Sequence, residues 1–171
     1  RGLAESAGVE DDVDFVVGTF SKSLGSIGGY CVSNHPELEA IRFSIRSYIF
    51  TASSSPAVIA STRVALRLLQ ERPQLRTQLW HNAERLYAGL KALGFTLGPQ
   101  ASPVVAVRIE DRETALRWWP QLLEQGIYVN LVVPPASPSA FSLLRCSVSA
   151  AHSDEQIDRM IRAFHTLRDG A

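Results

Sequence analysis

The sequence predicts an α/β protein in which two lobes are joined by one long helix. Short apolar runs alternate with segments whose apolar residues recur every three or four positions, as in strands interleaved with helices. At 171 residues and 46% hydrophobic content, the chain is long enough to bury a core. We place the first lobe at residues 1–72, and the connecting helix with a smaller C-terminal lobe at residues 73–171.

The first lobe opens with two predicted strands, at residues 13–17 and 29–32, separated by a loop rich in glycines and hydroxyls. A helix is expected to begin at 34–36, because proline suits the first helical turn. The apolar face of this helix would carry Leu38, Ile41, Ile45 and Tyr48. A hydroxyl-rich loop at 50–55 then precedes a helix from about 56 to 71.

The second lobe begins with a long predicted helix that starts at Pro73 and ends at Gly94. Its apolar residues recur at spacings of three and four, namely Leu75, Leu79, Ala83, Leu86, Leu90 and Leu93. A strand at 104–109 and a helix at 111–125 follow. Pro120 is expected to kink or split that helix, because proline lacks an N–H donor and crowds the preceding turn.

Two more strands and a helix are predicted for the end of the chain. The strands occupy residues 127–129 and 142–148, and a stiff proline-rich loop at 134–138 separates them. Ser153 and Gln156 have the spacing of a capping box, which predicts the start of the last helix. That helix would bury Ile157, Ile161, Phe164 and Leu167.

Charge and cysteine usage exclude several classes of function. Seventeen basic residues balance seventeen acidic ones, so the chain has no net charge. Its charge therefore gives no indication of a nucleic acid or an anionic membrane as partner. The apolar runs are far shorter than the roughly 20 residues of a membrane-spanning helix. Cys31 and Cys146 lie in separate apolar stretches, which predicts buried, reduced thiols in a cytoplasmic protein. The start, without methionine or signal-type segment, predicts a piece of a larger protein.

A single lysine stands in the segment GTFSKSLGSIGGY, residues 18–30, directly after the first predicted strand. Glycines and hydroxyls could let backbone donors approach a phosphate here. A Walker A loop requires G-x-x-x-x-G-K-[ST], however, and Val16 and Ser21 occupy both glycine positions. A lysine at a strand end can instead form a Schiff base. Pyridoxal 5'-phosphate needs such a lysine, together with hydroxyl donors for its phosphate.

This segment resembles the cofactor-lysine segment of the α-oxoamine synthase family. These fold-type I pyridoxal-phosphate enzymes condense an amino acid with an acyl thioester and release carbon dioxide. Three later segments resemble the same family in order and spacing: IFTASSSPAVIAS, GIYVNLVVPPASP and LLRCSVSAAHSDEQID. The resemblance is greatest to the bacterial serine palmitoyltransferase branch. It implies the C-terminal part of such a transferase, with the end of the large-domain mixed sheet at 1–72 and the small α+β domain at 73–171.

The resemblance also implies roles for individual residues. Lys22 resembles the lysine that holds the cofactor as an internal aldimine, with a solvated surface lysine as the alternative. Thr19 and Ser21 resemble the hydroxyl residues around the cofactor's ring oxygen and phosphate; read alone, they could be turn formers. Thr51, with Ala52 beside it, resembles the residue that reaches the phosphate of the neighbouring subunit in a homodimer, and helix capping is its alternative.

Arg145 lies inside an otherwise apolar predicted strand, where burial of an unpaired guanidinium is costly. The matching arginine of the family pairs with the substrate α-carboxylate, and a structural ion pair is the alternative. Aminotransferases commonly carry an arginine where this chain has Tyr30, and some bacterial members carry one where it has Val133. The first difference fits a site completed by a partner chain. His152 precedes the predicted helix cap and is expected to be structural.

The function implied by the resemblance is a pyridoxal-phosphate-dependent decarboxylative condensation. L-Serine and palmitoyl-CoA would give an α-oxoamine such as 3-oxosphinganine, the first step of sphingolipid biosynthesis. Two alternatives remain: a sister synthase of the 8-amino-7-oxononanoate, 2-amino-3-ketobutyrate or 5-aminolevulinate type, and a non-catalytic truncated subunit. The family's ring-stacking histidine and pyridine-pairing aspartate would lie upstream, so these residues alone are expected to be inactive. No metal is expected.

Overall fold

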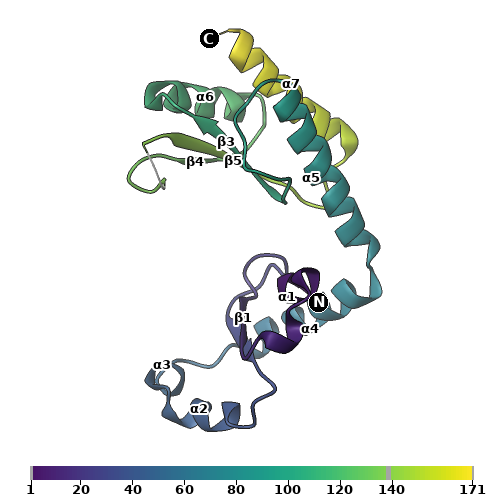
Figure 1. Ribbon diagram of the computed structural model, residues 1–171, viewed down its shortest axis with the longest axis vertical. Coiled ribbons are helices and arrows are strands. Elements are labelled where there is room, and N and C mark those ends of the chain that lie inside the picture. Colours follow the sequence, from purple (N-terminus) through teal and green to yellow (C-terminus); the bar gives the residue numbers. More distant parts are fainter. Residues whose placement is uncertain (1, 138–139, 171) are drawn as a thin grey trace. The chain divides into compact units, whose positions relative to one another are not determined.

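The computed structural model describes residues 2–137 and 140–170, and the chain forms two compact units, Arg1–Glu71 and Arg72–Ala171 (Figure 1). We call them unit 1 and unit 2 and describe each by itself. Among the described residues, no helix combines the length and apolar character needed to cross a bilayer. The assignment of residues 1–72 to a large cofactor-binding domain and of 73–171 to a small domain stays a prediction.

Unit 1 consists of short elements around a two-stranded antiparallel sheet. Its elements are α1 (Leu3–Ala7), the 3-10 helix η1 (Glu10–Asp12), β1 (Val16–Thr19), β2 (Gly29–Val32), α2 (Leu38–Ser44), α3 (Arg46–Ile49) and α4 (Pro56–Glu71). In the sheet, Val16 pairs with Val32 and Thr19 with Gly29. The first strand therefore lies later than the predicted 13–17. The single helix expected after 34–36 is divided at Ile45, whose backbone is extended.

Unit 1 has almost no interior of its own. Thr62 on α4 is its one buried residue in the described part, and all four residues of β2 are exposed. The prediction that Cys31 is buried is therefore wrong. Its strand has a single partner strand and no covering layer within the unit, so neither face of the sheet is shielded. Cys146, in unit 2, is buried and free, as predicted.

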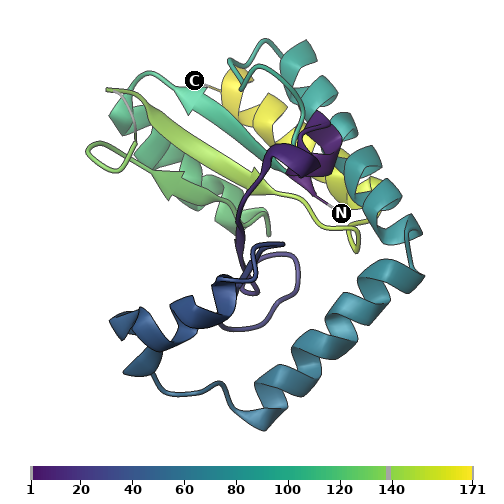
Figure 2. The same ribbon diagram turned by 60° about the horizontal axis from the view of Figure 1, so that its bottom comes forward.

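Unit 2 is a three-stranded antiparallel sheet with helices on one face. Its elements are α5 (Gln74–Ala92), β3 (Val104–Ile109), α6 (Arg112–Glu124), β4 (Asn130–Val132), β5 (Ser142–Ser147) and α7 (Asp154–Asp169). The strand order is β3-β5-β4, and Figure 2 shows α6 and α7 behind the strands. Alternate residues of β3 and β5 face the helices and form the core, namely Val105, Val107, Ile109, Leu144 and Cys146. The residues between them lie on the open face.

The helices complete this core with regularly spaced apolar residues. Those that are buried are Ala83, Leu86 and Leu90 of α5, Ala115, Trp118 and Leu122 of α6, and Ile157, Ala163, Phe164 and Leu167 of α7. The Phe95 ring meets Trp118 and Phe164 edge-on, with centroid distances of 6.1 and 5.6 Å. Leu75, at the start of α5, is instead 42% exposed. The predicted core face of α5 is thus occupied only in its C-terminal half.

Two local predictions for unit 2 need correction. α6 continues through Pro120, so the predicted split is wrong, while the predicted kink stays a prediction; Pro120 and Leu116 are exposed, so water can satisfy the carbonyl that loses its donor. The predicted strand at 127–129 is unpaired, and the paired strand starts at Asn130. The stretch before it is held by the indole N–H of Trp119, which donates to the Val129 carbonyl at 2.9 Å. Of the predicted loop at 134–138, Pro138 lies outside the described residues.

Candidate active site

The loop between β1 and β2 brings three predicted site residues together. The Lys22 Nζ donates to Ser21 Oγ at 3.3 Å, and Ser21 Oγ lies 2.8 Å from Thr19 Oγ1. Thr19 Oγ1 in turn donates to the carbonyl of Gly28 at 3.2 Å. Because the carbonyl can only accept and a charged lysine can only donate, the chain runs in one direction from the amine to the backbone. All three side chains are exposed.

Glycines allow this loop to close on itself. A Cβ on Gly18 would lie 2.4 Å from the Tyr30 ring, so a larger residue there would displace that ring. Gly28 has a φ of +98°, a conformation that side-chain-bearing residues rarely adopt. The Gly28 carbonyl also accepts from the backbone N–H of Phe20 at 3.0 Å. Tyr30, at the position where aminotransferases commonly carry an arginine, is packed against Gly18 and the Phe20 ring, 5.3 Å between centroids.

A helix residue that the sequence analysis did not identify anchors the same loop. Thr62 Oγ1 on α4 lies 2.7 Å from Ser26 Oγ and 2.8 Å from the Val58 carbonyl. Ser26 is tied back to the loop, since its backbone N–H donates to the Phe20 carbonyl at 2.9 Å. Threonine inside a helix carries no sequence signal for such a role. The contact appears only once α4 and the loop are placed side by side.

Among the described residues, no hydrogen bond joins Thr51 or Ala52 to the Lys22 loop. They lie between α3 and α4 and are exposed, and in the described part of the chain the Thr51 hydroxyl makes no hydrogen bond. The helix-capping alternative for Thr51 is wrong, because Ser55 Oγ accepts the N–H of Val58 at the start of α4. The role of Thr51 and Ala52 toward a neighbouring subunit stays a prediction.

Arg145 lies exposed on the open face of the sheet in unit 2, so its guanidinium does not incur the cost of burial. Strand alternation explains this exposure, because Leu144 and Cys146 point to the helices and Arg145 points away. Across the sheet Arg145 is paired with Asn130 on β4 and Ala106 on β3. Among the described residues it makes no ion pair, so the alternative of a structural ion pair finds no support within this chain.

A cavity of about 500 Å³ opens beside Arg145. Its lining includes the polar side chains of Asn130, Arg145, Ser147, His152, Gln156 and Arg159, the last of which donates to the Gln125 carbonyl. A guanidinium without an acid partner, in a cavity of this size, suits a small carboxylate. The cavity belongs to unit 2 alone.

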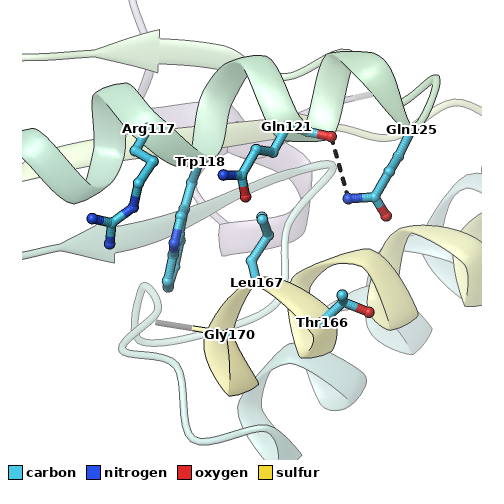
Figure 3. A pocket seen from close by; sticks show the side chains of 7 residues that line it. All are labelled: Arg117, Trp118, Gln121, Gln125, Thr166, Leu167 and Gly170. Atoms are coloured by element: carbon cyan, nitrogen blue, oxygen red, sulfur yellow. Dashed lines mark hydrogen bonds between the residues drawn. The ribbon is translucent and has the colours of Figure 1, made fainter.

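A second cavity, of about 430 Å³, lies between α6 and α7 (Figure 3). It is lined by Arg117, Trp118, Gln121, Gln125, Thr166, Leu167 and Gly170. The Gln125 side chain donates to the Gln121 carbonyl at 3.2 Å. This cavity contains no predicted site residue. Within residues 2–137 and 140–170, no cluster of histidine, cysteine, aspartate or glutamate could hold a metal ion.

Comparisons with known proteins agree with the sequence resemblance. The family described as aminotransferase class I and II matches residues 2–164. The chain is 58% identical over 164 residues to a serine palmitoyltransferase from Caulobacter vibrioides, covering 96% of this chain and 41% of that protein. It is 34% identical over 164 residues to an 8-amino-7-oxononanoate synthase from Alkaliphilus oremlandii, covering 96% of this chain and 42% of that protein.

The fold matches as well. A solved serine palmitoyltransferase with a pyridoxal-phosphate internal aldimine superposes with a TM-score of 0.96 at 47% identity, over 99% of this chain and 43% of that one. The chain thus spans less than half the length of the relatives it matches. The predicted fold, the C-terminal part of a fold-type I transferase, is confirmed. Both the matched residues and the fold show that this chain belongs to the aminotransferase class I and II family, with the α-oxoamine synthases as its relatives.

Proposed function

We propose that the whole protein condenses L-serine with palmitoyl-CoA, with loss of carbon dioxide and release of coenzyme A. The product would be 3-oxosphinganine, the first intermediate of sphingolipid biosynthesis. The observation that carries this proposal is the exposed hydrogen-bonded chain of Lys22, Ser21 and Thr19 in a protein 58% identical to a serine palmitoyltransferase. We also propose that it acts in the cytoplasm as a homodimer with shared active sites.

The residues of this loop suit pyridoxal 5'-phosphate. Lys22 carries a primary amine that can bind an aldehyde, and Thr19 and Ser21 offer hydroxyls to a ring oxygen and a phosphate. All three are exposed and lie within one hydrogen-bonded chain, so a ligand can reach them together. The cofactor, when bound, supplies electron withdrawal at the amino-acid Cα. Lys22 would then move a proton at that carbon.

Arg145 is proposed to bind the α-carboxylate of the amino acid. Its guanidinium is free of acidic partners among the described residues and lines a cavity of about 500 Å³. The planar fork of arginine makes two parallel hydrogen bonds to a carboxylate. Thr51 and Ala52, exposed and without side-chain hydrogen bonds among the described residues, would reach the phosphate in the partner subunit's site.

A sister synthase is the second candidate. Val133 occupies the position where some serine palmitoyltransferases carry an arginine, so carboxylate recognition here differs from theirs. Identity favours the first candidate, at 58% against 34% for the 8-amino-7-oxononanoate synthase. The two candidate functions differ in which amino acid and which acyl thioester the protein accepts.

The test is a condensation assay on the full-length protein with pyridoxal phosphate. Coenzyme A release is measured with L-serine, glycine and L-alanine, each against palmitoyl-CoA and pimeloyl-CoA. We expect turnover with L-serine and palmitoyl-CoA, and complete loss in Lys22→Ala. The matched control is Lys91→Ala, because Lys91 is the one other lysine of these 171 residues and lies on α5 beside Tyr87. Turnover only with glycine or alanine would replace this proposal by the sister synthase.

A further inference from the structure

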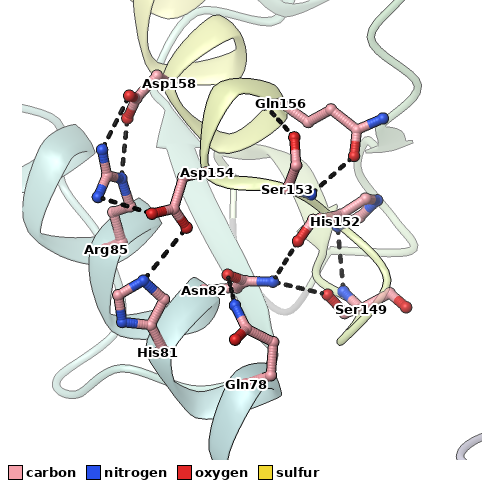
Figure 4. Close-up of polar contacts among 10 residues, drawn as sticks. All are labelled: Gln78, His81, Asn82, Arg85, Ser149, His152, Ser153, Asp154, Gln156 and Asp158. Carbon is pink, nitrogen blue, oxygen red and sulfur yellow. Dashed lines mark hydrogen bonds and ion pairs between the residues drawn. The ribbon is translucent and has the colours of Figure 1, made fainter. Parts of the chain in front are cut away.

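The turn that follows β5 fixes the chemical form of one histidine. The backbone N–H of Ser149 donates to Nδ1 of His152 at 3.1 Å (Figure 4). A backbone N–H can only donate, so Nδ1 carries a lone pair and the neutral ring holds its proton on Nε2. The structural role expected for His152 thus accounts for one ring nitrogen and leaves the other as a donor.

A buried amide on α5 holds the backbone of this turn at two points. Asn82 is fully buried, and its Nδ2 donates to the carbonyls of Ser149 at 3.0 Å and His152 at 2.9 Å (Figure 4). Its Oδ1 accepts from the side chain of Gln78 at 2.9 Å, which sets the orientation of the amide. Every polar atom of the Asn82 side chain is therefore engaged in placing this turn.

The residue after His152 is fixed as well. Ser153 caps α7, where its Oγ accepts the N–H of Gln156 at 3.3 Å. The Ser153 N–H donates to the Gln156 side chain at 2.9 Å, which completes the predicted capping box. His152 consequently stands between two fixed backbone points, so its ring has little freedom to reorient.

Nε2 of this ring has no partner in the part of the chain that the structure describes. His152 is half-buried and lines the cavity of about 500 Å³ together with Arg145, Asn130 and Ser147. Asn130 is directly opposite Arg145 in the β4–β5 pair. One cavity thus combines a permanent positive charge with a neutral N–H donor held in a fixed tautomer.

We propose that His152 is a substrate-binding residue whose Nε2–H donates to the α-carboxylate held by Arg145; this rests on the proposed function. A carboxylate has about four lone-pair sites, and a bidentate arginine uses two of them. A neutral donor can take another site without adding charge. Position 133 is valine in this chain and supplies no guanidinium, so a second donor to the carboxylate would come from another residue.

Two substitutions separate binding from structure, because asparagine and glutamine each imitate one ring nitrogen. In His152→Asn the side-chain oxygen can still accept from the Ser149 N–H, but no donor extends into the cavity. His152→Gln can place an N–H near the position of Nε2 and loses the bond to Ser149. A purely structural histidine would tolerate asparagine better than glutamine, and a carboxylate donor would show the opposite order in binding.

The experiment uses full-length protein loaded with pyridoxal phosphate, titrated with L-serine and with L-serinamide, which lacks the carboxylate. The absorbance of the bound cofactor reports binding, and thermal unfolding reports stability. We expect His152→Asn to weaken L-serine binding about tenfold, the effect of one hydrogen bond to a charged group, with L-serinamide binding and thermal stability unchanged. His152→Gln should bind L-serine better than His152→Asn while unfolding at lower temperature.

His165→Asn is the matched control, since His165 is exposed on α7 and pairs with Asp169 outside the cavity. It should bind L-serine as the unmodified protein does. L-Serine binding unchanged in His152→Asn, or a change confined to the KM for palmitoyl-CoA, would overturn this inference and leave the proposed function intact. Failure of the unmodified protein to bind any amino acid would overturn both.

Discussion

Unit 2 encloses a core, whereas unit 1 exposes most of its apolar side chains. In unit 2, Phe164, Leu86 and Leu144 are fully buried between three helices and a sheet. In unit 1, Phe43 is 75% and Phe50 80% exposed, and Thr62 is the one buried residue of the described part. The predicted cofactor lysine thus stands on the unit that lacks an interior, and the predicted carboxylate arginine on the unit that has one.

The Lys22 loop is held by hydrogen bonds although unit 1 buries almost nothing among its described residues. The Lys22 loop keeps its form through hydrogen bonds of Thr19 and Ser21 within the loop, through one hydrogen bond from Thr62 on α4, and through glycines that permit a tight closure. Those contacts need no core. The strands and helices around the loop do need one, because apolar burial provides most of the free energy of folding. The chain spans 41% of the length of the Caulobacter vibrioides protein that it matches.

The largest expected effect is on the folding of the separated units. Residues 72–171 alone should unfold in one cooperative transition, because their core is self-contained. Residues 1–71 alone should show no cooperative transition, since almost nothing in them is buried. Urea titration followed by circular dichroism measures both. A cooperative transition in residues 1–71 would show that unit 1 folds around an interior of its own.

Matched phenylalanine substitutions should differ strongly between the units. Phe164→Ala should lower the free energy of unfolding by about 3 to 5 kcal/mol, because it empties a fully buried site between helices and sheet. Phe43→Ala should change it by less than about 0.5 kcal/mol in the 171-residue chain, where that ring is 75% exposed. Urea unfolding of both variants gives the numbers. An equal loss of unfolding free energy in the two variants would mean that Phe43 is buried in the folded chain.

Replacing Arg145 should change amino-acid binding without changing the stability of unit 2. In the full-length protein, Arg145→Lys should weaken binding of the amino acid by about 2 to 5 kcal/mol, because a point charge cannot reproduce two parallel hydrogen bonds. The KM for the acyl thioester and the free energy of unfolding should stay unchanged, since the guanidinium is exposed and outside the core of unit 2. Steady-state kinetics with each substrate varied measures the effect. Lost stability at unchanged amino-acid binding would assign Arg145 to structure.

The reactivity of the two cysteines reports the difference in burial between the units without any substitution, because Cys31 lies in unit 1 and Cys146 in unit 2. Burial raises the pKa of the Cys146 thiol to about 12, and Cys31 is exposed. In the native 171-residue chain at pH 8, iodoacetamide should therefore modify Cys31 and spare Cys146. Mass spectrometry of tryptic peptides checks the result. In 6 M guanidinium chloride both should react, which is the control for reagent access.

The raised thiol pKa also sets a direction for stability with pH. Below the ordinary thiol pKa of 9.0, both the folded and the unfolded state keep the proton on Cys146. Between pH 9.0 and about 12, the unfolded state loses that proton and the folded state does not. The contribution of the Cys146 thiol to the free energy of unfolding therefore falls as pH rises. The decline should be absent in Cys146→Ala.

Features encoded by neighbouring residues were predictable from the sequence. The strand at 104–109 has the observed bounds, and the capping box of Ser153 and Gln156 is confirmed in both hydrogen bonds. The Lys22 loop with its hydroxyls forms from the segment that predicted it. In each case the signal and the structure lie within a few residues of each other, so local rules suffice.

Features that depend on distant neighbours were not predictable. Cys31 and Arg145 lie in apolar segments, but their exposure depends on which layers cover each face of the sheet. Thr62 and Asn82 act on segments 36 and 67 residues away, and neither contact leaves a periodic pattern. Their roles appear only when the elements are placed in space.

The site at which pyridoxal phosphate attaches tests the proposed role of Lys22 most directly. Full-length protein saturated with the cofactor is reduced with borohydride, digested and mapped by mass spectrometry. We expect the phosphopyridoxyl group on the peptide that contains Lys22, with Lys91 unmodified. A label on Lys91, or no covalent label at all in protein that binds the cofactor, would contradict it.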